Sequence, residues 1–115
     1  MAQSETIGKL TSALVDARNI INHPVRNKLG HHKNRYADLT AVLDSVVPVF
    51  TLKGLAVIQM VEGTTLVTTL AHTSGEFISS AADIPPHANA QQLGSALTYL
   101  RRYTVQALAA IAADD

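Results

Sequence analysis

The stretch from Asn89 to Asp115 predicts one long helix, and such a helix limits how the rest of a 115-residue chain can pack. Asn89 is a favourable N-cap, and Gln92 stands three residues later, where a capping box places Glu or Gln. No proline follows, and Ala, Leu, Gln and Arg favour helix. Helical spacing gathers on one face Leu93, Leu97, Leu100, Thr104, Ala107, Leu108 and Ile111. We expect this face to pack on the rest of the protein.

The opposite face of the same helix carries basic and aromatic side chains. It contains Arg102 with Ser95, Thr98, Tyr99 and Gln106, while Arg101 lies at its border. Tyr103 lies nearer the apolar face, where it would serve packing or an interface. A guanidinium stays charged and donates two parallel hydrogen bonds to phosphate. The arginine pair therefore predicts a phosphate-binding face, although periodicity alone fits a solvated face or an interface salt bridge equally well.

A second basic segment runs from Val25 to Tyr36. It contains Arg26, Lys28, Lys33 and Arg35, with His31 and His32 between them, and no acidic residue occurs from Ala17 to Ala37. This composition predicts a mobile basic loop or a short edge strand that follows a phosphate backbone while Tyr36 stacks on a base. It also fits a loop that only raises solubility. Adjacent histidines rarely bind one ion, and cysteine is absent, so we expect no metal site.

The remaining segments predict an α+β fold. Ser4 is placed to cap a first helix that runs to about Asn22, and Asp38 is placed to cap a second that ends at Lys53-Gly54. The apolar stripe of the second helix is Leu39, Val42, Leu43, Val46 and Val47. Strands are predicted over residues 55–61, 64–72 and 76–84, with short turns between them. We expect an antiparallel three-stranded β-meander, the long C-terminal helix packed on it, and two preceding helices.

Composition limits the class of protein. The formal net charge is zero, with nine basic and nine acidic residues, which argues against a polycation that coats nucleic acid but leaves local patches open. Hydrophobic content is 47% with only 4% aromatic, so we expect subunit contacts to cover part of the apolar surface in a homo-oligomer. The first residues, MAQSET, lack the basic and apolar regions of a signal peptide, and no apolar run approaches the ~20 residues that span a bilayer, so we expect neither a signal peptide nor a membrane span. We expect a single cytoplasmic domain over residues 1–115, without membrane contact.

The common signatures of catalysis are missing from the sequence. There is no P-loop and no GxGxxG motif, and the carboxylates are scattered over caps, turns and strand ends. We therefore expect neither an enzyme nor a cofactor. One catalytic alternative stays open, a metal-dependent nuclease that uses His31, His32 and Asp114.

Three stretches share the motifs of one known family. They are HKNRYADL at 32–39, LVTTLAHTSGE at 66–76 and GSALTYLRRYTVQALAAIAADD at 94–115, and the last is the most specific. Gly54-Leu55 and Val57 to Gln59 match a further run between them. Together, in the correct order and over roughly residues 4 to 115, they resemble the Erf (essential recombination function) family of phage single-strand annealing proteins.

The resemblance implies ATP-independent annealing of complementary single-stranded DNA in homologous recombination, by ring-shaped or helical homo-oligomers. It implies a β-β-β-α core similar to Redβ and the eukaryotic annealing proteins, with the strand in a basic groove that runs across subunits. It also implies that Lys33 and Arg35 precede the family tyrosine, Tyr36, and that Tyr99 and Tyr103 flank the arginine pair. With the basic segment, the candidate DNA-binding residues are Arg26, Lys28, Lys33, Arg35, Tyr36, Tyr99, Arg101 and Arg102.

Two positions depart from the family pattern. His32 stands where the family has Phe, so we expect no aromatic role there, and Ala110 replaces a Gly, so we expect loss of a tight turn. Relatives commonly continue past the final acid pair, so we expect a missing C-terminal tail. Further candidate partners are an exonuclease or a host single-strand-binding protein, in the cytoplasm of the host cell. The rival hypothesis is an oligomeric scaffold or partner-binding module whose basic face meets an acidic protein.

Overall fold

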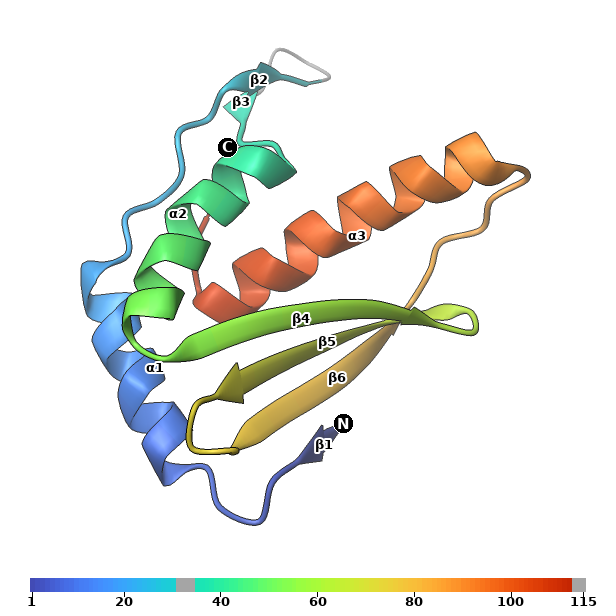
Figure 1. Ribbon diagram of the computed structural model, residues 1–115. Coiled ribbons are helices and arrows are strands. Elements are labelled where there is room, and N and C mark those ends of the chain that lie inside the picture. Colours follow the sequence, from blue (N-terminus) through green and yellow to red (C-terminus); the bar gives the residue numbers. More distant parts are fainter. Residues whose placement is uncertain (31–34, 113–115) are drawn as a thin grey trace.

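The computed structural model describes residues 1–30 and 35–112, which form an α+β fold as predicted (Figure 1). The helices are α1 (Gly8–Ile20), α2 (Leu39–Leu52) and α3 (Ala90–Ala109). The long strands are β4 (Leu55–Glu62), β5 (Thr65–His72) and β6 (Phe77–Asp83). Three two-residue strands are β1 (Ala2–Gln3), β2 (Lys28–Leu29) and β3 (Arg35–Tyr36). No helix among the described residues is long and apolar enough to cross a membrane.

The predicted meander forms, but the prediction of a three-stranded sheet is wrong. The main sheet has four antiparallel strands in the order β1-β6-β5-β4, because the start of the chain adds β1 beside β6. Ser4, predicted to cap the first helix, continues this edge instead. Its amide donates to the carbonyl of Phe77 at 3.0 Å, and its Oγ accepts the Phe77 amide at 2.9 Å. The first helix consequently begins later, at Gly8.

The carboxylate of Glu76, distant in the sequence, caps the N-terminus of α1. The amide of Leu10 donates to Glu76 Oε1 at 2.8 Å, and the hydroxyl of Thr6 donates to Oε2 at 2.7 Å. The turn before β6 holds Glu76 in place, since Ser74 Oγ accepts the Glu76 amide and contacts His72 Nδ1. Glu76 is only 9% exposed, and the hydrogen bonds from the Leu10 amide and the Thr6 hydroxyl lower its pKa. It therefore couples the β5–β6 turn to α1.

The core lies between one face of the sheet and all three described helices. Its most deeply buried large side chains are Leu10, Val42, Val46, Phe50, Leu66, Leu70 and Val105. Val42 and Val46 confirm the predicted stripe of α2, whereas Val47 is 45% exposed. Phe50 takes its place, one helical turn beyond Val46. The Asp38 cap and the Lys53-Gly54 end of α2 are both confirmed, with Gly54 at a φ of 74°.

Helix α3 begins as predicted but is rotated about its axis relative to the expected apolar face. The Gln92 amide donates to Asn89 Oδ1 at 2.9 Å, and Gln92 Oε1 accepts the Ala88 amide at 2.7 Å. Its buried residues are Val105, Gln106 and Ala109, because α3 packs on α2 as well as on β5. The prediction that Gln106 faces solvent is therefore wrong.

Helix α3 also ends earlier than predicted, at Ala109. Ala110 adopts a left-handed conformation, with φ 54° and ψ 43°, and the Ile111 amide returns to the carbonyl of Gln106 at 3.1 Å. The expected loss of a tight turn at this position is thus wrong, because the turn forms on alanine. The left-handed region is costly for a residue with a Cβ.

We expect Ala110→Gly to raise the free energy of unfolding by about 1 kcal/mol, because glycine adopts a positive φ without steric cost. Denaturant unfolding followed by circular dichroism measures the change. Ala107→Gly is the matched control on the exposed helix surface, and it should lower stability by about 1 kcal/mol. Equal destabilisation by both substitutions would contradict the strain at Ala110.

Candidate nucleic-acid interface

The described ends of the basic segment form a small hairpin. β2 and β3 pair antiparallel, with Lys28 opposite Tyr36 and Leu29 opposite Arg35, which confirms the predicted short strand. Lys28 and Arg35 are exposed, and so is Arg26, just before β2. Lys33 and both neighbouring histidines of the candidate metal site, His31 and His32, lie outside the described residues.

Asn27 fixes this hairpin to the start of α2. Its side-chain carbonyl accepts the Asp38 amide at 3.1 Å, and its side-chain NH₂ donates to Asp38 Oδ1 at 3.3 Å. Asp38 Oδ1 also accepts the Ala41 amide at 2.9 Å as the helix cap. These hydrogen bonds, with Ala41 contributing most and the charges of Lys28 and Arg102 adding to them, hold the Asp38 pKa below its ordinary value. The site therefore contains a persistent carboxylate.

Arg102 joins α3 to the hairpin. Its guanidinium carbon lies 4.7 Å from the ring centre of Tyr36, 4.8 Å from that of Tyr103 and 5.9 Å from that of Tyr99. Its Nη1 donates to the carbonyl of Ala37 at 3.3 Å. The ring centres of Tyr99 and Tyr103 lie 4.6 Å apart, and the two ring planes are inclined by 51°. A cation over several aromatic faces is held by their negative π-surfaces, so Arg102 is positioned before any ligand arrives.

Arg101 points elsewhere, so the expectation of paired guanidiniums on one face is wrong. Its Nε donates to Gln59 Oε1 on β4 at 3.2 Å. Gln59 in turn donates to Thr104 Oγ1 at 2.8 Å and to Thr68 Oγ1 at 3.1 Å. Side chains of adjacent helical residues differ by about 100° in direction, so Arg101 points toward the sheet while Arg102 points toward the hairpin. Arg101 belongs to a polar network between α3 and the sheet.

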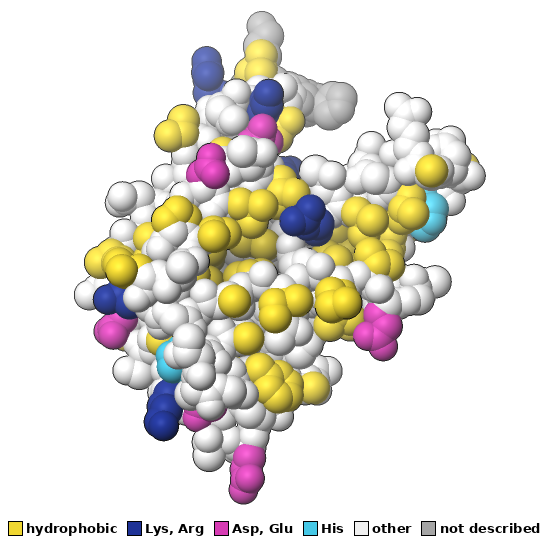
Figure 2. Space-filling view, viewed as in Figure 1, with side chains coloured by type: hydrophobic (Ala, Val, Ile, Leu, Met, Phe, Trp, Pro, Cys, Tyr) yellow, Lys and Arg dark blue, Asp and Glu magenta, His cyan; other side chains and the backbone are white. Residues whose placement is uncertain are grey.

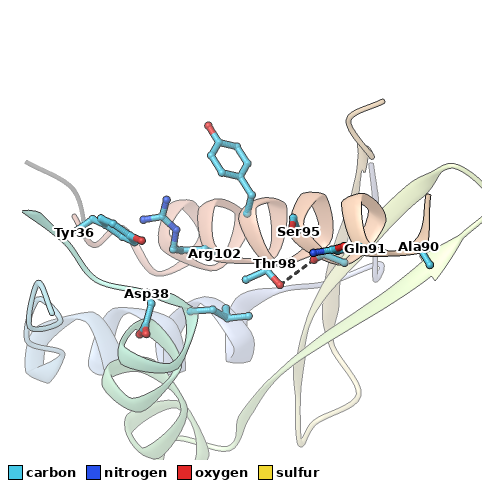
Figure 3. A pocket seen from close by; sticks show the side chains of 10 residues that line it. Tyr36, Asp38, Ala90, Gln91, Ser95, Thr98 and Arg102 are labelled. Atoms are coloured by element: carbon cyan, nitrogen blue, oxygen red, sulfur yellow. Dashed lines mark hydrogen bonds between the residues drawn. The ribbon is translucent and has the colours of Figure 1, made fainter. Parts of the chain in front are cut away.

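An open groove of about 620 Å³ runs between the hairpin, the start of α2 and the exposed face of α3. Its lining is Tyr36, Asp38, Leu39, Ala90, Gln91, Gly94, Ser95, Thr98, Tyr99 and Arg102. Figure 3 shows Tyr36 and Arg102 reaching toward each other, with Asp38 below them and Ser95 and Thr98 along the helix. In Figure 2, cationic side chains lie over the hairpin.

Sequence periodicity found most of the helix side of this groove. Ser95, Thr98, Tyr99 and Arg102 do share one face, as expected. The sequence did not predict the hydrogen bonds between Asn27 and Asp38 that fix the hairpin to α2, because no local pattern connects a hairpin residue to a helix cap. Among the described residues, no group of three or more His, Asp or Glu side chains could hold a metal ion. Asp114 of the nuclease alternative lies outside them.

Comparison with known families identifies the chain. The family model described as ERF superfamily matches residues 10–115. The chain belongs to the ERF superfamily. No curated protein and no solved structure matches it.

Several residues of the family motifs stabilise the fold of this ERF chain. Ala37 is fully buried, and its carbonyl accepts Arg102; Asp38 caps α2; Glu76 binds the start of α1. Gly54, where a Cβ would lie 3.0 Å from Thr73 Oγ1, turns the chain into β4 at positive φ. Much of the ERF pattern thus maintains the fold, and Tyr36, Tyr99 and Arg102 remain as groove residues.

Proposed function

We propose that this ERF protein binds single-stranded DNA and anneals complementary strands in homologous recombination, as a ring-shaped or helical homo-oligomer. The proposal involves no ATP and no catalytic step. The single observation that supports it best is the groove in which Arg102 meets Tyr36, because this contact joins the two segments that carry the candidate cations and rings.

The groove suits a strand held without regard to its sequence. Tyrosine faces and a guanidinium plane stack on any base, and cations on the adjacent hairpin attract phosphates. Lys28 and Arg35 are exposed on that hairpin, and Tyr99 is 54% exposed on α3. Annealing needs such sequence-tolerant contacts, since each strand must leave its pairing edges available to the other.

One chain offers few cations to a strand, so we infer that binding depends on repetition. Affinity for single strands falls with salt by about 0.7 log units per phosphate contact and per tenfold increase in salt, and a few contacts give weak binding at physiological salt. Copies arranged side by side supply many contacts at high effective concentration. The zero formal net charge lets copies assemble without strong mutual repulsion.

We expect the protein to bind labelled single-stranded oligonucleotides of unrelated sequence with similar affinity, and more tightly as their length grows. It should also accelerate pairing of complementary strands without ATP. Fluorescence anisotropy measures the binding, and a quenching assay measures strand pairing. As a control, the affinity for one long strand that forms no hairpin is compared with the affinity for a strand of the same composition in scrambled order.

Absence of binding even at low salt would contradict the proposal and favour the scaffold that meets an acidic protein. Binding without faster pairing would leave a single-strand-binding protein and remove the annealing step. Cleavage of the strands on addition of divalent ions would favour the nuclease alternative.

A further inference from the structure

Apolar side chains are exposed around strand β4, at one edge of the main sheet. In the order β1-β6-β5-β4 it is the last strand, and the only described strand paired with it is β5. Ile58 and Met60, on the sheet face away from the helices, are 45% and 66% exposed. Val61, on the helix side, is 53% exposed. Large apolar side chains exposed together mark a contact with another molecule.

Two charged side chains belong to the same region. Arg101 reaches it from α3, where its Nε donates to Gln59 Oε1 on β4, and no other nitrogen of Arg101 is engaged with a described residue. Glu62 ends β4 and is exposed. Figure 2 shows hydrophobic side chains over β4. A positioned arginine beside exposed methionine is typical of protein–protein interfaces. The β4 surface is defined here as Ile58, Met60, Val61, Glu62 and Arg101.

Helix α1 carries a second surface of the same kind. Val15 and Ile20 are 62% and 48% exposed, and they flank Asp16 on the helix face opposite the core. Lys9 is exposed two helical turns before Asp16. These four residues are the α1 surface. Figure 1 shows α1 on the side of the molecule away from the turn that follows β4, so the two surfaces lie apart.

The two surfaces match in charge and in spacing, since each carries one cation and one anion. Lys9 and Asp16 are seven residues apart in a helix, about 10 Å along its axis at about 1.5 Å per residue. Gln59, which holds Arg101, and Glu62 are three residues apart in a strand, about 10 Å at about 3.3 Å per residue. A docking that brings Arg101 to Asp16 therefore also brings Glu62 to Lys9. The apolar side chains of both surfaces then meet between the two pairs.

We propose that the β4 surface of one copy of this chain binds the α1 surface of the next copy. Each copy then uses two different surfaces, so the contact repeats head to tail and generates a ring if the rotation closes, or a helix if it does not. Arg101 serves this contact, whereas Arg102 faces the groove. The inference specifies the subunit contact of the homo-oligomer and rests on that part of the proposed function.

We expect light scattering without DNA to give a mass of more than two 12.2 kDa chains, and Met60→Lys and Val15→Lys each to reduce it to one chain. An unpaired ammonium group in either surface is costly to bury on association. Both residues are exposed enough to be replaced without loss of the core. Leu29→Lys is the matched control, because Leu29, 64% exposed, lies on the β2–β3 hairpin outside both surfaces. It should leave the mass unchanged.

Mixing the two variants tests whether the contact is head to tail. Met60→Lys retains an intact α1 surface, and Val15→Lys retains an intact β4 surface. An equimolar mixture should therefore form pairs of twice the chain mass and no larger species. A contact between two identical surfaces would not be restored by mixing.

Charge reversal tests the pairing of Arg101 with Asp16. Asp16→Lys and Arg101→Glu should each weaken self-association by roughly tenfold, because an attraction becomes a repulsion in every contact. The variant that carries both changes should recover the association, since the two charges are exchanged between the surfaces. Sedimentation equilibrium measures the association constants.

A single-chain mass at every concentration would overturn the inference. So would a Met60→Lys or Val15→Lys protein of wild-type mass, a mixture that stays single-chain, an equal loss in Leu29→Lys, or a double charge variant that does not recover. Oligonucleotide binding is measured separately on each protein. A wild-type oligomer that binds no DNA refutes the proposed function alone, whereas variants of wild-type mass that bind and pair strands refute this contact alone.

Discussion

Replacing Glu76 with alanine is expected to lower the Tm by roughly 5–10 °C, the largest effect on stability that we predict for a single side chain. The carboxylate accepts the Leu10 amide and the Thr6 hydroxyl. That amide lies in the first turn of α1, where no helical carbonyl is available to it. Without Glu76 the amide loses its partner, and the β5–β6 turn separates from α1. Thermal unfolding followed by circular dichroism measures the loss.

The same residue predicts how stability depends on pH. The pKa of Glu76 is lower in the folded protein than its ordinary value of 4.5, because the Leu10 amide and the Thr6 hydroxyl bind the ionised form. Its contribution is therefore fully present above pH 4.5 and is lost as pH falls through the lower folded pKa. Asp38, whose pKa is also lowered, acts in the same direction at lower pH.

Two controls separate the carboxylate of Glu76 from side-chain packing. Glu76→Gln keeps the shape of the side chain and removes its charge. Its Tm should be lower than that of the wild type at pH 7 and should fall less steeply as the pH is lowered. Glu5→Ala removes an exposed glutamate and should behave as wild type. A Glu76→Gln protein with the wild-type acid profile would show that the charge has no part in capping α1.

The second large effect is expected at Arg102. Arg102→Ala should weaken binding to single-stranded oligonucleotides by about tenfold at any sequence, since stacking on an aromatic or guanidinium plane contributes about 1–3 kcal/mol per base. It should also reduce the slope of log affinity against log salt by about 0.7 if the guanidinium contacts a phosphate. Anisotropy titrations at several salt concentrations give both quantities.

Arg102→Lys distinguishes charge from planar geometry. It should restore the salt slope but not the affinity, because lysine keeps the charge and loses the flat surface between the rings. Arg18→Ala is the matched control, because Arg18 lies on α1 outside the groove and donates to the carbonyl of Leu108 at 2.9 Å. If Arg102→Ala, folded and of wild-type mass, bound as tightly as wild type, the groove would not be the DNA site.

Local sequence patterns predicted most of the helices and strands of this fold. The caps at Asp38 and Asn89 and the helix end at Gly54 depend on their immediate neighbours, and the structure confirms each of them. The three long strands also lie close to their predicted residues, because alternation and turns are local signals.

The errors arose where distant segments meet. Ser4 was expected to cap a helix but pairs with Phe77, and no local pattern reveals a partner so far along the chain. Gln106 is buried because α3 crosses α2, and a helical wheel does not specify the direction of that crossing. The candidate site shows the same division. The sequence predicted the groove face of α3, but it did not predict that Arg101 turns to Gln59 on β4 while Arg102 turns to Tyr36, because both partners are distant in the chain.

Asp38 gives the groove a property that an all-cationic channel lacks. Its carboxylate lines the same groove as Arg102 and stays ionised, so a phosphate that approaches Arg102 is repelled by Asp38. Under the proposed function, each subunit would hold its few nucleotides loosely while the assembly holds the strand as a whole. A polymer tethered by many short-lived contacts can shift by one nucleotide without escaping, and two strands must make such shifts to find the alignment in which they match.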